Sequence, residues 1–189
     1  MDSDAARRDE LLAMMVGDQM PSTGPVRLEE YDPSWPVQFE REAATVRDIL
    51  GPEELRLEHV GSTSVPGLAA KPVIDMLLVV TDSSDETSYV PAMESEGYVL
   101  RIREPDWHQH RLLKGPATDI NLHVFSDGCP EVNRLLLFRD WLRSHPEDRQ
   151  HYERAKRRLA ERDWAFVQDY ADAKSGIVEE IITRASSAP

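Results

Sequence analysis

A loop of small residues between two strand-like stretches constrains this chain more than any other feature. The flanking stretches cover residues 55–60 and 73–80, and the second is almost entirely apolar. The loop contains Gly61, Ser62, Thr63, Ser64 and Gly67. Small residues let backbone N–H groups approach an anion closely, and hydroxyl groups add further donors. The pattern predicts either an anion-binding turn or a plain, tight connection between two strands.

Asp75 interrupts the apolar second stretch, Val73-Ile74-Asp75-Met76-Leu77-Leu78. A lone carboxylate is costly to bury without a partner. We therefore expect Asp75 to face a cation, a metal ion or solvent in a cleft beside the loop. The alternative is that Asp75 accepts backbone hydrogen bonds within the strand connection.

Apolar periodicity predicts a mixed sheet with flanking helices. Further strands are expected at residues 98–103, 107–114 and 120–125, with a hairpin turn at 115–119. Helices are expected at residues 34–51, 85–95, 129–144, 147–162 and 167–184. This order of elements indicates an α+β fold with a C-terminal helical segment.

The first 24 residues form a separate unit in this interpretation. Their apolar stripe, which includes Leu11 and Met15, predicts a helix at residues 3–16, and Gly17, Pro21 and Gly24 follow it as helix breakers. The prediction is a helical arm and linker at residues 1–24 and one domain at residues 25–189.

The acidic composition narrows the range of partners. The 189 residues include 35 Asp and Glu against 22 Lys and Arg, which gives a formal net charge of -13. Such a chain is repelled by phosphate backbones unless a local basic patch overcomes the overall field, so no nucleic-acid partner is expected. A small nucleotide remains compatible with this charge, and it is the expected class of substrate.

Compartment and membrane association follow from segments that the sequence lacks. No apolar run reaches the ~18 residues of a membrane span, and the N-terminal residues lack the apolar core of a secretory signal. Cys129 is the single cysteine, which excludes an internal disulfide framework. The sequence predicts a cytoplasmic protein without a membrane partner and leaves the oligomeric state open.

Four histidines fall on or beside the predicted strands. His59 precedes the loop, His108 and His110 have the i, i+2 spacing of one strand face, and His123 lies on the next strand. If His59, Asp75 and His123 converge, they form a ligand set for one Zn, Fe or Mn ion. Alternatively, His59 or His123 acts as a general base, or the histidines are hydrogen-bonded residues of the sheet.

The segment HVGSTSVPGLAAKPVID at residues 59–75 closely resembles the signature of the GrpB (UPF0157) family. The segments YDPSWPVQFE, INLHVF and LFRDWLRSHPEDRQHYERAK resemble the same family, as does the stretch from Tyr170 to Lys174. The family is placed among the nucleotidyltransferases similar to DNA polymerase beta. The resemblance therefore implies a nucleotidyltransferase-like mixed β-sheet.

The superfamily pattern assigns roles to individual positions. Its Gly-Ser turn corresponds to Gly61-Ser62, and the first of its paired strand carboxylates corresponds to Asp75. The partner position, however, is Leu77, and the strand that normally carries a third carboxylate offers Asn121 and His123. A two-metal centre needs several oxygen ligands, and these positions offer only one carboxylate.

The resemblance implies a nucleotidyl- or phosphoryl-transferase that uses a divalent metal (Mg, Mn or Zn) and a small-molecule acceptor. The candidate catalytic residues for this activity are Asp75, His123 and Lys71. The candidate phosphate- and substrate-binding residues are Gly61, Ser62, Thr63, Ser64, Arg111, Arg139 and Lys174. The candidate metal ligands are Asp75, His59 and His123.

A second interpretation comes from the substitution at position 77. A domain that kept the phosphate loop but lost the metal centre is a catalytically inert nucleotide- or coenzyme-binding module. Domains that resemble this family also occur fused to dephospho-coenzyme A kinase, which is compatible with that role.

Overall fold

The computed structural model describes residues 3–51, 56–116 and 119–188, and a five-stranded mixed sheet forms its centre. The strands are β1 (Arg56–Val60), β2 (Ile74–Val80), β3 (Val99–Glu104), β4 (His110–Lys114) and β5 (Ile120–Ser126). Their order across the sheet is β1-β2-β5-β4-β3. The β2–β5 pair is parallel, and the other three pairs are antiparallel.

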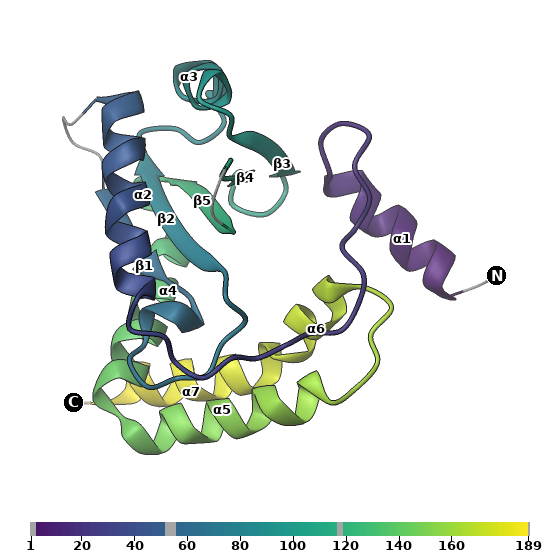
Figure 1. The fold of residues 1–189 in the computed structure, drawn as a ribbon, viewed down its shortest axis with the longest axis vertical. Coiled ribbons are helices and arrows are strands. Elements are labelled where there is room, and N and C mark those ends of the chain that lie inside the picture. The colour runs from purple at the N-terminus through teal and green to yellow at the C-terminus, as the bar shows by residue number, and fades with distance from the viewer. Residues whose placement is uncertain (1–2, 52–55, 117–118, 189) are drawn as a thin grey trace.

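Two helices, α2 (Trp35–Leu50) and α3 (Val90–Ser95), cover one face of the sheet. Figure 1 shows α2 along one side of the strands and the N-terminal helix α1 (Ser3–Met14) on the other side. The apolar side of α2 packs on the inward residues of β2, which include Met76 and Leu78. Because β2 is buried on both faces, its sequence is apolar except at Asp75.

The opposite face of the sheet is divided between packing and a cleft. Helix α4 (Pro130–Ser144) packs Val132 and Leu136 against Leu77, Val79 and Phe125. Further along the same face, Asp75, Asn121 and His123 border the cleft. The apolar part of this face anchors α4, and the polar part remains accessible to a ligand.

Three C-terminal helices lie at one end of the sheet: α5 (Pro146–Ala160), α6 (Val167–Ala173) and α7 (Ser175–Ser187). Leu142 of α4, Tyr152 of α5 and Ile181 of α7 form a cluster with Val65 and Leu68 of the small-residue loop. This cluster packs the C-terminal segment against the loop and holds the loop in place.

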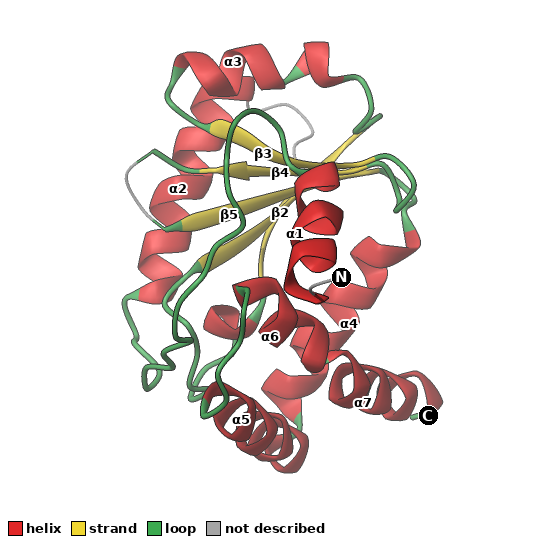
Figure 2. Ribbon diagram, turned by 90° about the vertical axis from the view of Figure 1, so that its right-hand side faces the viewer, coloured by secondary structure: helices red, strands yellow, loops and turns green. Residues whose placement is uncertain are grey.

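The N-terminal helix α1 (Ser3–Met14) lies in front of the sheet in Figure 2, beside α6. Its Arg7 forms ion pairs with Asp169 and Asp172 of α6. Just after the helix, the Val16 N–H donates to the carbonyl oxygen of Arg101 on β3 (3.0 Å). The arm therefore contacts both the edge strand and the C-terminal helices, while its boundary at residue 24 stays a prediction.

The predicted α+β fold with a mixed sheet is confirmed, and one strand and two helices differ from their predicted extents by more than two residues. The strand predicted at 107–114 begins at His110, because His108 and Gln109 adopt left-handed backbone conformations in a turn. The helix predicted at 85–95 is a 3-10 turn, η2 (Glu86–Ser88), followed by α3. Pro91 has no N–H to donate to a carbonyl of the preceding turn, so it is tolerated in the first turn of α3 but not inside one continuous helix, which accounts for the interruption.

The helix predicted at residues 167–184 is interrupted at Lys174, where the N–H of this residue donates to the carbonyl of Ala171 and tightens the last turn of α6. The predicted strand residue Leu55 and positions 117–118 of the predicted hairpin turn lie outside the described residues. Among the residues with described structure, no helix combines the length and the apolar character needed to cross a bilayer.

Candidate functional site

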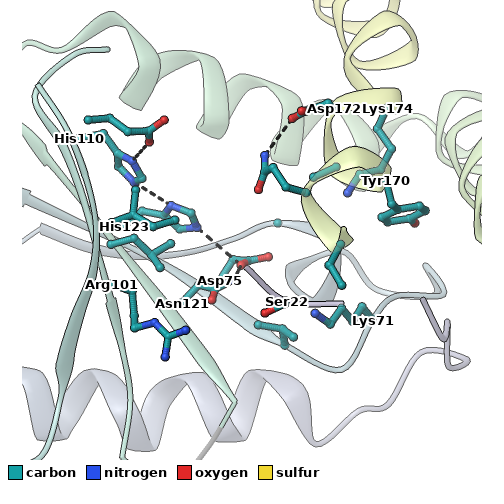
Figure 3. A pocket seen from close by; sticks show the side chains of 18 of the residues that line it. Ser22, Lys71, Asp75, Arg101, His110, Asn121, His123, Tyr170, Asp172 and Lys174 are labelled. Atoms are coloured by element: carbon teal, nitrogen blue, oxygen red, sulfur yellow. Dashed lines mark hydrogen bonds and ion pairs between the residues drawn. The ribbon is translucent and has the colours of Figure 1, made fainter. Parts of the chain in front are cut away.

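A cleft of about 810 Å³ lies on the sheet face that carries Asp75. The sheet forms its floor, the Gly61-Ser62 turn and the C-terminal helices form one end, and α1 and β3 form the other. Figure 3 shows Asp75 and Asn121 between Lys71 and Lys174 on one side and Arg101 on the other. The cleft therefore brings together residues from most of the length of the chain.

Gly61 is required by its contact with Asp75. Its φ is +69° and its ψ is -173°, a conformation that is open almost exclusively to glycine. A Cβ atom at this position would lie 2.3 Å from Oδ2 of Asp75. The absence of a side chain at Gly61 thus lets the turn approach the Asp75 carboxylate closely.

Asp75 is held by side chains of the neighbouring strand. The Asn121 amide donates to its Oδ1 (2.7 Å), and Nε2 of His123 lies 3.6 Å from the same oxygen. Burial raises the pKa of the Asp75 carboxyl, but His123 and Asn121 outweigh burial, so that the pKa lies below its usual value. Asp75 is therefore an ionised carboxylate at neutral pH.

His123 belongs to a chain of polar groups that crosses the floor of the cleft. Its Nδ1 lies 3.0 Å from Nε2 of His110, and Nδ1 of His110 lies 2.7 Å from the Glu104 carboxylate (Figure 3). Burial lowers the pKa of His110 to about 4, so this ring is neutral at pH 7. Its one N–H therefore donates to Glu104, and its Nε2 accepts from Nδ1 of His123. This arrangement fixes the orientation of the His123 ring and turns Nε2 of His123 toward Asp75.

Two lysines from the C-terminal helices face the Gly61-Ser62 end of the cleft. The Lys156 ammonium is buried, donates to the Ser62 hydroxyl (3.0 Å) and to the Ala69 carbonyl, and lies 4.9 Å from the centre of the Tyr152 ring. Burial, reinforced by repulsion from Lys174, lowers the pKa of Lys156 to about 7. Neither lysine forms an ion pair with a carboxylate of the described chain.

Lys174 is the more accessible of the two lysines. Its Nζ lies 4.7 Å from the centre of the Tyr170 ring, and burial lowers its pKa although Asp75 and Asp172 oppose the shift. The Tyr170 hydroxyl is buried at the same end and has no hydrogen-bond partner among the described residues. An unpartnered buried hydroxyl beside a lysine is a favourable place for an anion that accepts hydrogen bonds.

The hydroxyls of the small-residue loop have different surroundings. Ser62 lines the cleft, and so does Thr63, but the Thr63 hydroxyl donates to the carbonyl of Val73 (3.1 Å). The Ser64 hydroxyl donates to the carbonyl of Gly61 (2.6 Å) and stabilises the turn from within. The structure therefore brings Gly61, Ser62 and Lys71 to the cleft and turns the side chain of Ser64 away from it.

The predicted convergence of His59 with Asp75 and His123 is wrong. Strand β1 pairs with β2 so that His59 lies opposite Met76, on the face covered by α2. There the His59 ring stacks on Phe39 and contacts the Thr63 hydroxyl (3.0 Å), and burial lowers its pKa to about 4. His59 is a neutral residue of the core.

Two predicted substrate-binding arginines and one histidine also lie elsewhere. Arg111 is buried on the α3 side, where it pairs with Glu86. Arg139 joins α4 to β1 through Glu58 (2.7 Å) and the carbonyl of His59. His108 lies in the turn before β4, so it shares no strand face with His110.

The residues around Asp75 do not fit a two-metal centre. Leu77, on the same strand face, is fully buried among the apolar residues beneath α4, and Asn121 turns its amide donor toward Asp75. Within the described ranges, no group of three or more His, Cys, Asp and Glu side chains is arranged to hold a metal ion. The donors offered to a single ion are Asp75 and Nε2 of His123.

Sequence reasoning left four residues out of the predicted site: Lys156, His110, Asn121 and Arg101. The i, i+4 pair of Tyr152 and Lys156 was a signal for the first of these, because it places an aromatic ring and a cation on one helix face. The i, i+2 spacing of Asn121 and His123 was a signal for the amide. No sequence pattern around Arg101 indicated that it lines the cleft.

Comparisons with known proteins agree over most of the chain. The model of the family described as GrpB protein matches residues 25–184. A UPF0157 protein of Halalkalibacterium halodurans is 60% identical over 179 residues, covering 95% of this chain and 92% of the relative. The crystal structure of conserved protein GrpB from Enterococcus faecalis aligns with a TM-score of 0.70 at 32% identity, covering 84% of this chain and 96% of the other.

A longer protein also contains a related segment. A dephospho-CoA kinase of Mycolicibacterium paratuberculosis is 30% identical over 187 residues, which covers 85% of this chain but 46% of the kinase. The similarity therefore concerns one part of that protein.

Proposed function

Because the chain belongs to the GrpB family, we propose that its cleft binds a nucleotide by the phosphates and transfers a nucleotidyl or phosphoryl group to a small acceptor. The superfamily that the sequence resembles gives the class of reaction. The surroundings of Asp75 give the roles of individual residues.

The observation that carries this proposal is a group of cations without acidic partners at one end of the cleft. Lys71, Lys156 and Lys174 line this end, and no carboxylate of the described residues pairs with them. The acidic residues that line the cleft, in contrast, have polar or charged partners: Asp75, Glu104, Glu131 and Asp172. An anion with several charges is the ligand that complements such a site.

Asp75 is the proton acceptor in the proposed transfer. A hydroxyl oxygen of the acceptor attacks the phosphorus, and the new P–O bond forms as the bond to the departing phosphate breaks. The bonding electrons leave on the departing oxygen, which the lysines stabilise, and the acceptor proton passes to Asp75. The Asn121 amide orients the carboxylate, His123 lies beside it, and His110 and Glu104 hold His123 in place.

The binding-module alternative rests on Leu77. The buried leucine leaves the cleft without the paired carboxylates of a two-metal transferase. The relationship to one part of a dephospho-CoA kinase makes a coenzyme-like nucleotide a suitable ligand for such a module.

Thermal unfolding with nucleoside triphosphates, diphosphates and coenzyme A tests the binding step, with and without Mg²⁺, Mn²⁺ or Zn²⁺. A ligand at 100 times its Kd should stabilise the protein by about 2.7 kcal/mol. We expect Lys174→Met to lose this stabilisation and Lys114→Met to keep most of it, because Lys114 also lines the cleft but is already paired with Asp119. No stabilisation by any nucleotide would overturn the proposal.

Phosphorus NMR on nucleotide-loaded protein with candidate acceptors then separates the two interpretations. The transferase interpretation predicts that the wild type releases pyrophosphate (nucleotidyl transfer) or the nucleoside diphosphate (phosphoryl transfer) as the modified acceptor appears. It predicts that Asp75→Asn loses this turnover and retains nucleotide binding. The binding-module interpretation predicts binding without turnover in both proteins.

A further inference from the structure

Arg101, at the end of the cleft opposite the lysines, is a cation that the transfer chemistry has not used. Arg101 is half-buried and lines the cleft. Its guanidinium donates no hydrogen bond to, and forms no ion pair with, any of the described residues. Its neighbour Arg103, in contrast, donates twice to the Glu86 carboxylate (2.6 Å each). Arg101 is therefore available to a ligand.

A β-bulge explains how Arg101 reaches the cleft. The pairing of β3 with β4 shifts register between Leu100 and Ile102, so that Arg101 is left without a partner residue in the ladder. Bulges change the direction of a side chain and are common beside functional sites. As a result, both Arg101 and Ile102 line the cleft although they are adjacent on one strand.

The arm and the sheet place an apolar wall beside Arg101. Leu11, Met14 and Met15 line the cleft from the arm, and Ile102 and Leu112 line it from the sheet. Met15 is bridged to Ile102, and the N–H of the next residue is bonded to the Arg101 carbonyl, so this wall and the cation belong to one end of the cleft. The lysine end consists instead of ammonium groups, a hydroxyl and a glycine turn.

We propose that this second end is the acceptor subsite and that it takes a small molecule with an apolar body and one carboxylate. This proposal rests on the proposed transfer. One unpaired guanidinium balances one negative charge, and its planar fork matches a carboxylate in a bidentate pair. The apolar body lies against the methionine wall, and the reacting hydroxyl points toward Asp75, between the two ends (Figure 3).

Calorimetric titration with hexanoate tests the subsite without a known acceptor. Hexanoate carries the proposed carboxylate and apolar body, 1-hexanol lacks the charge, and hexylphosphonate distinguishes a carboxylate site from a phosphate site. We expect saturable binding of hexanoate to the wild type, at least about tenfold weaker binding to Arg101→Gln, and a smaller response to hexanol in both proteins. Tighter binding of hexylphosphonate would overturn the assignment to carboxylates.

Two further variants keep the test decisive. Arg41→Gln, on an exposed arginine of α2, should bind hexanoate like the wild type. Met14→Gln makes the wall polar without adding a charge and should weaken hexanoate binding by a similar factor. Binding that is equal in the wild type, Arg101→Gln and Met14→Gln would overturn the subsite.

Nucleotide titrations on the same proteins separate this inference from the proposed function. If ATP binding depends on Lys174 while hexanoate binds equally well to the wild type and to Arg101→Gln, the acceptor subsite is wrong and the nucleotide site stands. If ATP does not bind and hexanoate binding depends on Arg101, the cleft recognises a carboxylate but is no transferase site.

Discussion

At the scale of single residues, Gly61 has the least room for a side chain among the nine glycines, because a Cβ atom there would meet Asp75. We expect Gly61→Ala to lower the free energy of unfolding by about 2 to 4 kcal/mol, because the new Cβ meets the carboxylate and adds backbone strain. Gly67→Ala is the matched control, since Gly67 also has a positive φ but a Cβ added there would meet no atom within 4 Å. Equal losses in chemical denaturation would show that the Asp75 contact adds nothing beyond strain.

The lowered pKa of Lys156 leads to a specific prediction for how stability depends on pH. Its pKa is about 7 in the folded protein, whereas the unfolded chain keeps the ordinary lysine value, so from pH 7 to 9 the unfolded state binds more protons. Stability should therefore rise with pH by roughly 1 kcal/mol per unit from this group. We expect Lys156→Met to remove that contribution and Lys71→Met, on an exposed lysine, to retain it. Parallel stability curves for wild type and Lys156→Met would contradict the shift.

At the scale of elements, α1 is attached to the rest of the chain through few groups. Arg7 supplies its ion pairs to α6, and Leu11 is its one buried residue. We expect Arg7→Gln to speed amide hydrogen exchange in α1 about fivefold, which corresponds to the loss of roughly 1 kcal/mol, while exchange in the sheet stays unchanged. Arg8→Gln, on an exposed residue of the same helix, is the control. Unchanged exchange in Arg7→Gln would assign the docking to the apolar contacts and the bond to β3.

The division of the sheet between α4 and the cleft explains why one strand serves both packing and chemistry. Asp75 and Leu77 are two residues apart on β2 and share a face. Leu77 lies under α4, and Asp75 lies beyond the end of that cover. A carboxylate at position 77 would therefore be desolvated among apolar side chains instead of joining Asp75 in a metal site.

At the scale of the whole molecule, charge is separated between the body and the cleft. The chain carries a net charge of -13, yet the cleft gathers Lys71, Lys156, Lys174 and Arg101 without acidic partners in the described structure. The overall field disfavours long polyanions such as nucleic acids, and the unpaired cations of the cleft favour a small anion that fits inside. The composition alone does not reveal this grouping of unpaired cations.

The sequence by itself determined the local features of this protein. Apolar alternation located the strands, and the small residues from Gly61 to Ser64 placed a tight turn before Asp75. These features depend on backbone conformation and side-chain size over a few residues, so they can be predicted from a short stretch of chain.

Only the tertiary structure decided which side chains meet. Strand register placed His59 in the core and His123 beside Asp75, and a shift by one residue would have exchanged the two faces of a strand. Likewise, Lys156 and Lys174 reach the Gly61-Ser62 turn because helices much later in the chain pack against the loop. Such contacts join residues that are far apart in the chain, so they cannot be predicted from the sequence around either residue.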